Sequence, residues 1–194
     1  MIQTLAKADN QTSNQYFVKQ AVTWEQFKSL QSSFEAIAGI RLIYCEGMLE
    51  IMGIGLQHEM ISTLLGSLLS FYFLLNRIQF ISTGAYSQIV EAKTEFQADL
   101  SYSFNGRKEV TDLCVEVVVT SGNVQKLRKY LLRGIPEVWF WEDGKIAIYS
   151  LRDGGYLQVE SSLCLPDLDI RHLEQCLLMD SHLDAMVAFG DRYK

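Results

Sequence analysis

Two carboxylates in apolar surroundings are the residues of this sequence best suited to chemistry. Glu116 lies inside "DLCVEVVV", a run that begins at Asp112 and predicts a buried strand because most of its residues are apolar. Asp99 lies in "ADLSYSF", where polar and apolar residues alternate and predict another strand, with Asp99 on its polar face. Charged side chains are rarely buried without a partner, so Glu116 requires a positive group.

The identity of that positive group decides the chemistry. If the two strands are neighbours, Asp99 and Glu116 lie close together and repel, unless a cation stands between them. A divalent metal ion, Lys126 at the start of the following helix, or an arginine could provide it. Mg²⁺ binds one or two carboxylates and fills its shell with water and substrate phosphate. Two acids, a metal and a lysine can cleave a phosphodiester, because the metal activates water and the lysine neutralises developing charge.

Four further residues are candidates to support this site. Glu50 lies in an expected hairpin, and His58 and Glu59 lie where a helix is expected to begin. Asp112 shares a strand face with Glu116 but lies about 13 Å away along the strand, which makes it a weak metal candidate. Each has a simpler interpretation, since Glu50 fits an exposed strand position and an acid at a helix start is favoured by the helix dipole.

The two principal carboxylates also have structural interpretations. Asp99 alone fits a solvated residue on an outward strand face. Glu116 alone fits a structural ion pair with Lys126 or with Lys129, since clusters of charged residues with perturbed pKa values can be purely structural. The residues by themselves leave these alternatives open.

The elements that carry these residues predict an α/β or α+β chain built on one mixed sheet. Residues 1–15 are expected to form a flexible polar tail and residues 16–194 a single domain. Glu46-Gly47 and Asp143-Gly144 are expected hairpin turns, and Thr23 with Gln26 predicts a capping box. Helices are expected at about 23–34, 58–77 and 123–133 and twice near the C-terminus, and strands around 40–52, 79–83, 86–91, 97–104, 112–119 and 137–160.

Composition limits the function classes. The net charge of −6 and pI of about 5.1 count against a non-specific nucleic-acid binder, although basic residues gather locally at Lys126, Arg128, Lys129 and Arg133. The four scattered cysteines lack a zinc pattern, and the polar N-terminus lacks a signal segment, which together predict a cytoplasmic protein with reduced thiols. The run "MISTLLGSLLSFYFLL" is shorter than the roughly 20 apolar residues of a membrane span. We therefore expect a core helix there and no membrane association.

Several motifs together resemble one bacterial family. "YCEGMLEIM", His58-Glu59, "ADLSYSF", "TDLCVEVVVTSGNVQKLRKY" and "GIPEVWFW" resemble the Uma-type restriction endonucleases, formerly a domain of unknown function, in the PD-(D/E)xK nuclease superfamily. The resemblance spans most of residues 22–180. It departs from the family pattern at Ala98 and Thr111, which replace prolines.

The resemblance implies a restriction-endonuclease-like core, in which helices flank a mixed β-sheet. It implies that Asp99 and Glu116 hold Mg²⁺ or Mn²⁺. The superfamily's lysine usually stands two residues after the second acid, where this chain has Val118, so Lys126 on the next helix is implied as the catalytic lysine.

These observations predict a cytoplasmic, metal-dependent endonuclease that hydrolyses phosphodiester bonds in DNA. Cleavage of both strands of a duplex needs two sites, so a homodimer is expected. RNA is an alternative substrate for the same site. A second hypothesis, favoured by the acidic pI, is a binding or interaction protein that keeps the nuclease fold without turnover.

Overall fold

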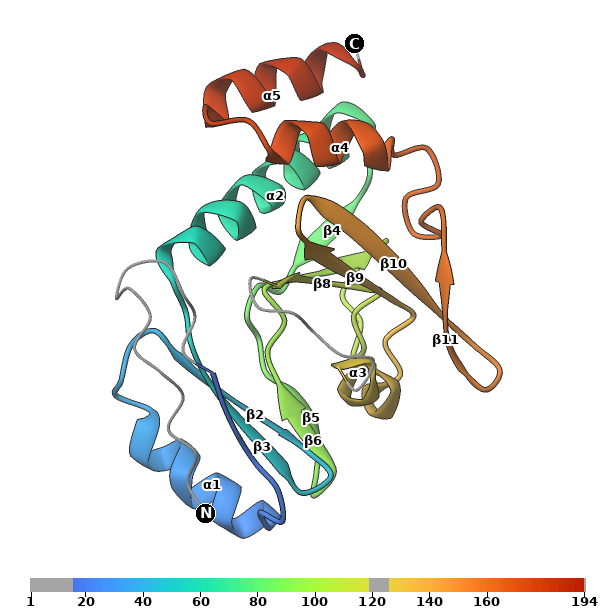
Figure 1. The fold of residues 1–194 in the computed structure, drawn as a ribbon. Coiled ribbons are helices and arrows are strands. Elements are labelled where there is room, and N and C mark those ends of the chain that lie inside the picture. Colours follow the sequence, from blue (N-terminus) through green and yellow to red (C-terminus); the bar gives the residue numbers. More distant parts are fainter. Residues whose placement is uncertain (1–15, 119–125, 194) are drawn as a thin grey trace.

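The protein is mixed α/β, with two β-sheets flanked by helices (Figure 1). The computed structural model describes residues 16–118 and 126–193, so the expected tail at 1–15 and the expected helix start at 123–125 lie outside the described residues. The described helices are α1 (Trp24–Phe34), α2 (Leu56–Leu75), α3 (Leu127–Arg133), α4 (Ile170–Leu177) and α5 (His182–Asp191).

The small sheet contains five strands in the order β1-β3-β2-β6-β5. They are β1 (Tyr16–Lys19), β2 (Ile40–Cys45), β3 (Met48–Gly53), β5 (Gln88–Val90) and β6 (Thr94–Phe96). The large sheet contains six strands in the order β11-β10-β9-β8-β7-β4. They are β4 (Phe80–Ser82), β7 (Leu100–Phe104), β8 (Leu113–Val118), β9 (Glu137–Glu142), β10 (Lys145–Arg152) and β11 (Gly155–Val159). Strands β8 and β9 run parallel and the other described pairs antiparallel, so the large sheet is mixed.

Local sequence signals explain several element boundaries. The Thr23 hydroxyl accepts from the Gln26 N–H and the Gln26 side chain accepts from the Thr23 N–H, which confirms the capping box that starts α1. The two expected hairpin turns are confirmed as well. Asp143 and Gly144 have φ of 49° and 79°, as a two-residue turn between twisted strands requires.

The expectation of one sheet is wrong. The sequence predicts one strand over residues 97–104, but only Leu100–Phe104 form a strand, β7 of the large sheet. The preceding strand, β6, ends at Phe96, was not predicted and belongs to the small sheet. The segment from Gln97 to Asp99 links the two sheets. Alternation of polar and apolar residues indicates which face a side chain occupies, but it does not indicate which sheet a strand joins.

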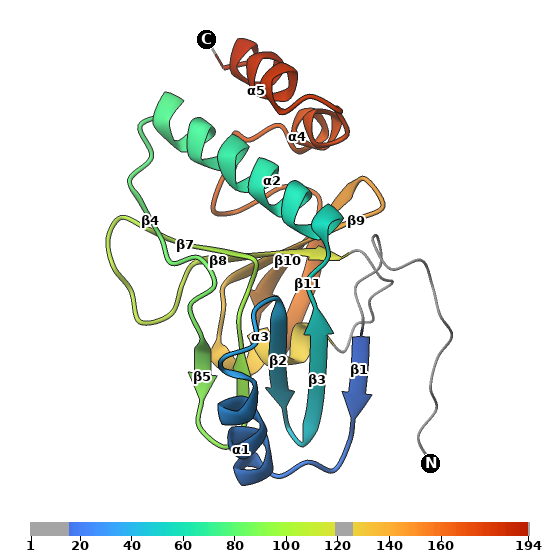
Figure 2. The same cartoon turned by 90° about the vertical axis from the view of Figure 1, so that its left-hand side faces the viewer.

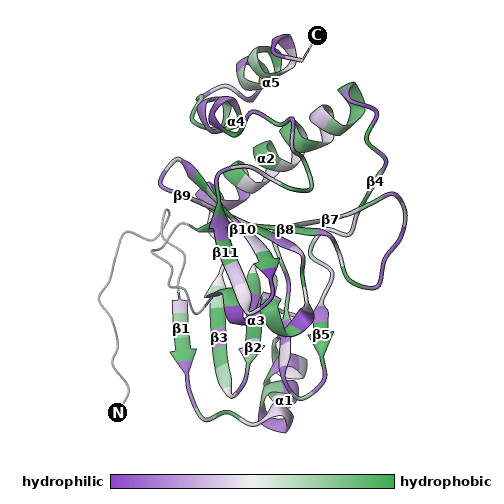
Figure 3. Ribbon diagram, turned by 90° about the vertical axis from the view of Figure 1, so that its right-hand side faces the viewer, coloured by the Kyte–Doolittle hydropathy of each residue, from purple (hydrophilic) through white to green (hydrophobic). Residues whose placement is uncertain are grey.

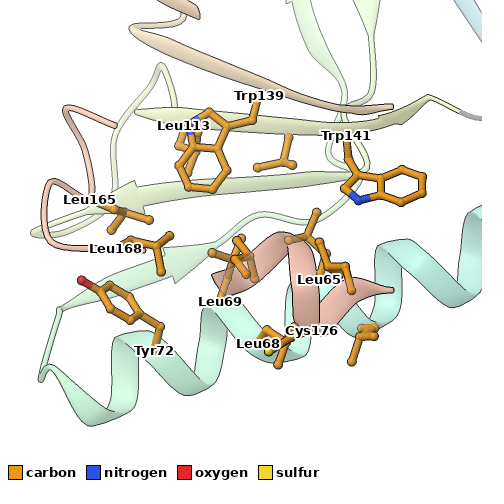
Figure 4. Close-up of a cluster of buried hydrophobic side chains, with 14 of the residues drawn as sticks. Leu65, Leu68, Leu69, Tyr72, Leu113, Trp139, Trp141, Leu165, Leu168 and Cys176 are labelled. Carbon is orange, nitrogen blue, oxygen red and sulfur yellow. The ribbon is translucent and has the colours of Figure 1, made fainter. Parts of the chain in front are cut away.

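The main core lies between the large sheet and helices α2, α4 and α5, which cover one of its faces (Figures 1 and 2). Leu65, Leu68 and Leu69 of α2 pack towards Leu113 and Trp139 of the sheet (Figure 4). Helix α2 is apolar over much of its length (Figure 3) and could cross a membrane by length and composition alone. One such helix is weak evidence for a span, and its contacts with α4, α5 and β8 are those of a core helix.

The opposite face of the large sheet meets α3 and the small sheet, whose strands run crosswise to β7 and β8 (Figure 2). A second apolar cluster fills this space and includes Phe96 and Ala98 before β7, Cys114 in β8, Tyr130 in α3 and Val138 in β9. Because Cys114 and Glu116 are two residues apart in one strand, Glu116 points into this same space. The carboxylate that needs a partner therefore lies between the sheets.

Candidate functional site

The two principal carboxylates meet where the chain crosses from the small sheet to the large one. Strands β7 and β8 pair with Leu100 opposite Val115, so Asp99 follows in register beside Glu116. The backbone N–H of Val117 donates to Asp99 Oδ2 at 2.7 Å, which fixes the Asp99 carboxylate against β8. The neighbouring strands therefore bring both acids to one place, as the sequence led us to expect.

Asp99 is held by side chains from two other elements. Its own side chain is 1% exposed, which excludes the interpretation as a solvated strand residue. Arg41 of β2 donates to Oδ1, and His58 Nε2 from the first turn of α2 lies 3.0 Å from Oδ2. Burial alone would raise the pKa of Asp99, but the hydrogen bonds and positive charges around it prevail and lower that pKa to about 2.

His58 is buried and contacts Asp99, whereas a residue that only caps a helix would remain at the surface. Burial favours its neutral form, but the bond and charge of Asp99 outweigh burial and raise the His58 pKa. Because an ionised carboxylate only accepts, Nε2 is the donor in this contact. Glu59 is exposed and its Oε1 lies 3.4 Å from His58 Nδ1, which forms no hydrogen bond among the described residues.

Two side chains of α3 form hydrogen bonds to the Glu116 carboxylate. Lys129 Nζ donates to Glu116 Oε1 at 3.0 Å, and the Tyr130 hydroxyl donates to the same oxygen. The Lys129 ammonium also lies 5.3 Å from the centre of the Phe96 ring, a cation–π contact. Burial raises the pKa of Glu116 and the charge of Asp99 adds to this effect, while Lys129 and Tyr130 oppose it. The buried counter-ion of Glu116 is therefore Lys129.

Lys126 lies just before α3 and is partly buried. Within the described part of the chain its ammonium forms no ion pair. Burial lowers its pKa, and the negative charges of Glu116, Glu142 and Glu50 counteract that shift. The structure thus places Lys126 within electrostatic reach of Glu116.

The remaining candidates divide between the site and other places. Glu50 lies in the middle of β3, and its negative charge raises the pKa of Lys126. Asp112 lies at the other end of β8, where it pairs with Lys108 at 2.7 Å and accepts from the Phe104 N–H at 2.8 Å. Asp112 therefore closes a turn and is not brought to the site.

Three of the four basic residues expected to form a patch near α3 bond other groups of the protein, two of them at the surface. Arg128 donates twice to Glu46 at 2.7 Å, and Arg133 contacts the Glu109 carbonyl oxygen at 2.6 Å. With Lys129 bound to Glu116, the patch no longer presents a row of unpaired cations. The acidic net charge is thus not offset by a basic face on this helix.

Sequence reasoning missed two residues of the site, Arg41 and Tyr130. Arg41 stands inside the apolar strand "IRLIYC", where a lone arginine signals a buried carboxylate partner, but the sequence does not say which. Tyr130 is fully buried among Phe96 and Phe140, with its hydroxyl on Glu116. A buried tyrosine needs a hydrogen-bond partner, which is the signal that could have identified it.

The two carboxylates fit a divalent ion by their chemistry. No group of three or more His, Cys, Asp or Glu side chains that could hold a metal occurs in the described ranges 16–118 and 126–193. Mg²⁺ and Mn²⁺ prefer oxygen ligands, and Mg²⁺ uses one or two carboxylates together with water. Asp99 and Glu116 supply that set, and each now bonds a cation of the protein, Arg41 and Lys129 respectively.

Comparison with known proteins gives a family and a structural relative. The family model described as "Uma2: Putative restriction endonuclease" matches residues 24–185. The crystal structure of a "putative nuclease belonging to DUF820" from Anabaena variabilis is similar at 15% identity and a TM-score of 0.49, covering 87% of this chain and 99% of the other. No curated protein matches the chain.

Proposed function

We propose that this chain, which belongs to the Uma2 family of restriction endonucleases, hydrolyses phosphodiester bonds in DNA with the help of Mg²⁺ or Mn²⁺. The observation that supports this most is the buried meeting of Asp99 and Glu116, with Lys126 in electrostatic reach. Two buried acids from adjoining strands are costly unless a function or a partner retains them. Family membership supports the nuclease reaction, and the donor set supports the divalent ion.

Asp99 and Glu116 would hold the ion, which supplies a bound water of lowered pKa and stabilises negative charge on the phosphate. The protein's own residues hold these acids ready. His58 and the Val117 N–H orient Oδ2 of Asp99, and Lys129 and Tyr130 orient Oε1 of Glu116. Because these donors come from β8, α2 and α3, both carboxylates are fixed before any substrate arrives.

Lys126 differs from Lys129 in its ion pairing, and this difference favours Lys126 as the residue that contacts substrate. Lys129 is committed to Glu116, whereas Lys126 forms no ion pair within the described residues and its pKa is lowered by burial. A partly desolvated ammonium attracts a phosphate more strongly than one in bulk water. Lys126 is therefore the residue proposed to neutralise charge that develops on the scissile phosphate.

A homodimer is proposed for cleavage of duplex DNA, since one site cuts one strand. Helices α2 and α5 expose large apolar side chains on the described surface, among them Leu74 at 71% and Leu183 at 72%. Such residues fit a subunit interface better than a solvated surface. RNA remains a proposed alternative substrate, because phosphodiester chemistry at this site does not depend on the sugar.

A second candidate function is a binding module that keeps the nuclease fold without turnover. Two observations favour it: the net charge of −6, and the neutralisation of both acids by cations of the protein itself. In this alternative, Asp99 and Glu116 are structural ion pairs. Metal binding distinguishes the two, because structural pairs have no need of a divalent ion.

Cleavage of supercoiled plasmid DNA with Mn²⁺ or Mg²⁺ tests the proposal. We expect the wild type to nick the plasmid, and Glu116→Gln and Lys126→Met to lose activity by about 100-fold or more. Lys108→Met, which removes a surface lysine paired with Asp112, is the matched control and should cleave normally. Unchanged cleavage in both site variants refutes the assignment, and absence of cleavage by any form favours the binding module.

A further inference from the structure

We infer that Arg41 is a built-in competitor of the divalent ion, because it occupies the oxygen of Asp99 that the ion would use. The inference rests on the proposed metal site and adds a residue that limits metal affinity. Arg41 comes from the small sheet, whereas Glu116 belongs to the large sheet and Asp99 to the link between the sheets. It is thus a contact between two separate parts of the fold.

The two oxygens of Asp99 are used differently. Oδ2 already accepts from the Val117 N–H and lies 3.0 Å from His58 Nε2. Among the described residues, the hydrogen bond to Oδ1 comes from Arg41 alone. The pair is nearly dry, with side-chain exposures of 12% for Arg41 and 1% for Asp99. Oδ1 is therefore the oxygen of Asp99 with fewer hydrogen bonds, and an ion that binds there competes with Arg41.

Arg41 cannot yield by losing its charge. A guanidinium keeps its proton in proteins, whereas a lysine or histidine beside a metal can become neutral. A guanidinium and a divalent cation on one buried carboxylate would repel each other strongly, because the surroundings screen poorly. Metal binding therefore requires Arg41 to leave Oδ1, and the free energy of the Arg41–Asp99 contact is subtracted from the affinity for the ion.

The ion pair between Lys129 and Glu116 opposes metal binding less than the pair between Arg41 and Asp99 does. Glu116 has Tyr130 as a second donor on the same oxygen, so its carboxylate remains oriented if Lys129 moves. Lysine also has a flexible stem and a single ammonium group, in contrast to the planar fork of arginine. Arg41 is therefore the residue whose removal should change metal affinity most.

Titration with Mn²⁺ alone, followed by calorimetry and by thermal unfolding, tests the inference without an activity assay. Arg41→Met keeps an unbranched apolar stem and removes the charge, and it should bind Mn²⁺ about tenfold more tightly than the wild type. In chelator, Arg41→Met should unfold at a lower temperature, and Mn²⁺ should raise that temperature more than it does for the wild type. Arg128→Met, which breaks the exposed pair with Glu46, is the matched control and should change neither quantity.

Two more variants make the result decisive. Arg41→Gln can still donate a hydrogen bond but carries no charge, so it should also bind Mn²⁺ more tightly, and it serves if Arg41→Met does not fold. Arg41→Lys keeps a positive charge, but on a more flexible stem that can lose its proton, so it should bind Mn²⁺ with an affinity between those of the wild type and Arg41→Met. Unchanged or weaker binding in Arg41→Gln and Arg41→Met overturns the inference.

The same titration separates this inference from the proposed function. If wild-type binding disappears in Asp99→Asn but the Arg41 variants bind no tighter, the metal site stands and competition by Arg41 is wrong. If neither the wild type nor the Arg41 variants bind Mn²⁺ in a way that depends on Asp99, both the inference and the metal site are wrong.

Discussion

Lys129→Met is expected to lower the free energy of unfolding by about 3 kcal/mol, and Lys126→Met by less than about 1 kcal/mol. The Lys129 and Glu116 side chains are each 10% exposed, and Nζ lies 3.0 Å from Oε1. Removing one partner of a buried pair typically costs about 3–5 kcal/mol. We expect the lower end, because Tyr130 still donates to Glu116 and the raised pKa of Glu116 eases its protonation.

Lys126 provides the matched comparison on the same segment. It forms no ion pair within the described residues, and burial works against its charge. A methionine of similar length retains most of the packing of its stem. The two lysines, three residues apart in sequence, should therefore separate into one that stabilises the fold and one whose loss mainly affects activity.

Urea unfolding in chelator at neutral pH measures both effects, and a double-mutant cycle assigns the cause. In a Glu116→Gln background, the cost of Lys129→Met should fall by at least about 1 kcal/mol, because no buried negative charge remains unpaired. Equal costs for the two lysine variants would contradict the reasoning, as would a cost for Lys129→Met that the Glu116→Gln background leaves unchanged.

Substitutions at four other positions test separate parts of the structure. The pKa of Asp99 is lowered from 3.8 to about 2, so its contribution is complete above pH 3.8 and is lost as the pH falls towards 2. The wild type should therefore lose about 2 kcal/mol more than Asp99→Asn in urea unfolding between pH 5 and pH 2, and parallel curves would contradict this. Tyr130→Phe should cost about 2 kcal/mol, because it removes a buried donor to a charged acceptor, and a neutral result would show that the bond is not formed in solution. Gly134 ends α3 with φ of 76°, so Gly134→Ala should cost about 1 kcal/mol, with Gly134→Asn costing less, and an equal or reversed order would argue against backbone strain. Thr23→Ala should cost about 1 kcal/mol by removing the capping box, as measured by thermal unfolding, and no change would mean that the cap contributes nothing.

Features that depend on neighbouring residues were predictable from the sequence. The turns at Glu46-Gly47 and Asp143-Gly144 and the Thr23 cap are set by residues a few positions apart, and all three are present. Likewise, the requirement that Glu116 have a partner follows from its apolar neighbours alone. These predictions succeed because the physical cause lies within one short segment.

The choice between Lys126 and Lys129 depends on geometry that spacing does not reveal. Residues three apart lie on one face of a helix, so either lysine could reach Glu116 if both were helical. The described helix begins at Leu127, which places Lys126 before it and Lys129 within its first turn. Lys129, inside the helix, pairs with Glu116, whereas Lys126, before it, forms no ion pair within the described residues.

Contacts between segments far apart in the chain also could not be predicted from the sequence. Arg41 and Asp99 are separated by 58 residues, and their contact exists because the small sheet folds back beside the large one. The link between β6 and β7, which joins the two sheets, takes the first three residues of the strand expected over 97–104. The sequence shows neither which carboxylate Arg41 meets nor where the chain changes sheets, since each results from packing between sheets.

The proposed metal site is tested best by a crystal structure grown with Mn²⁺, with the ion located by its anomalous scattering. We predict one anomalous peak in contact with both Asp99 and Glu116, and a side chain of Arg41 that has left Asp99 Oδ1. A structure at saturating Mn²⁺ with both ion pairs intact, and with no peak between the two carboxylates, would contradict this prediction.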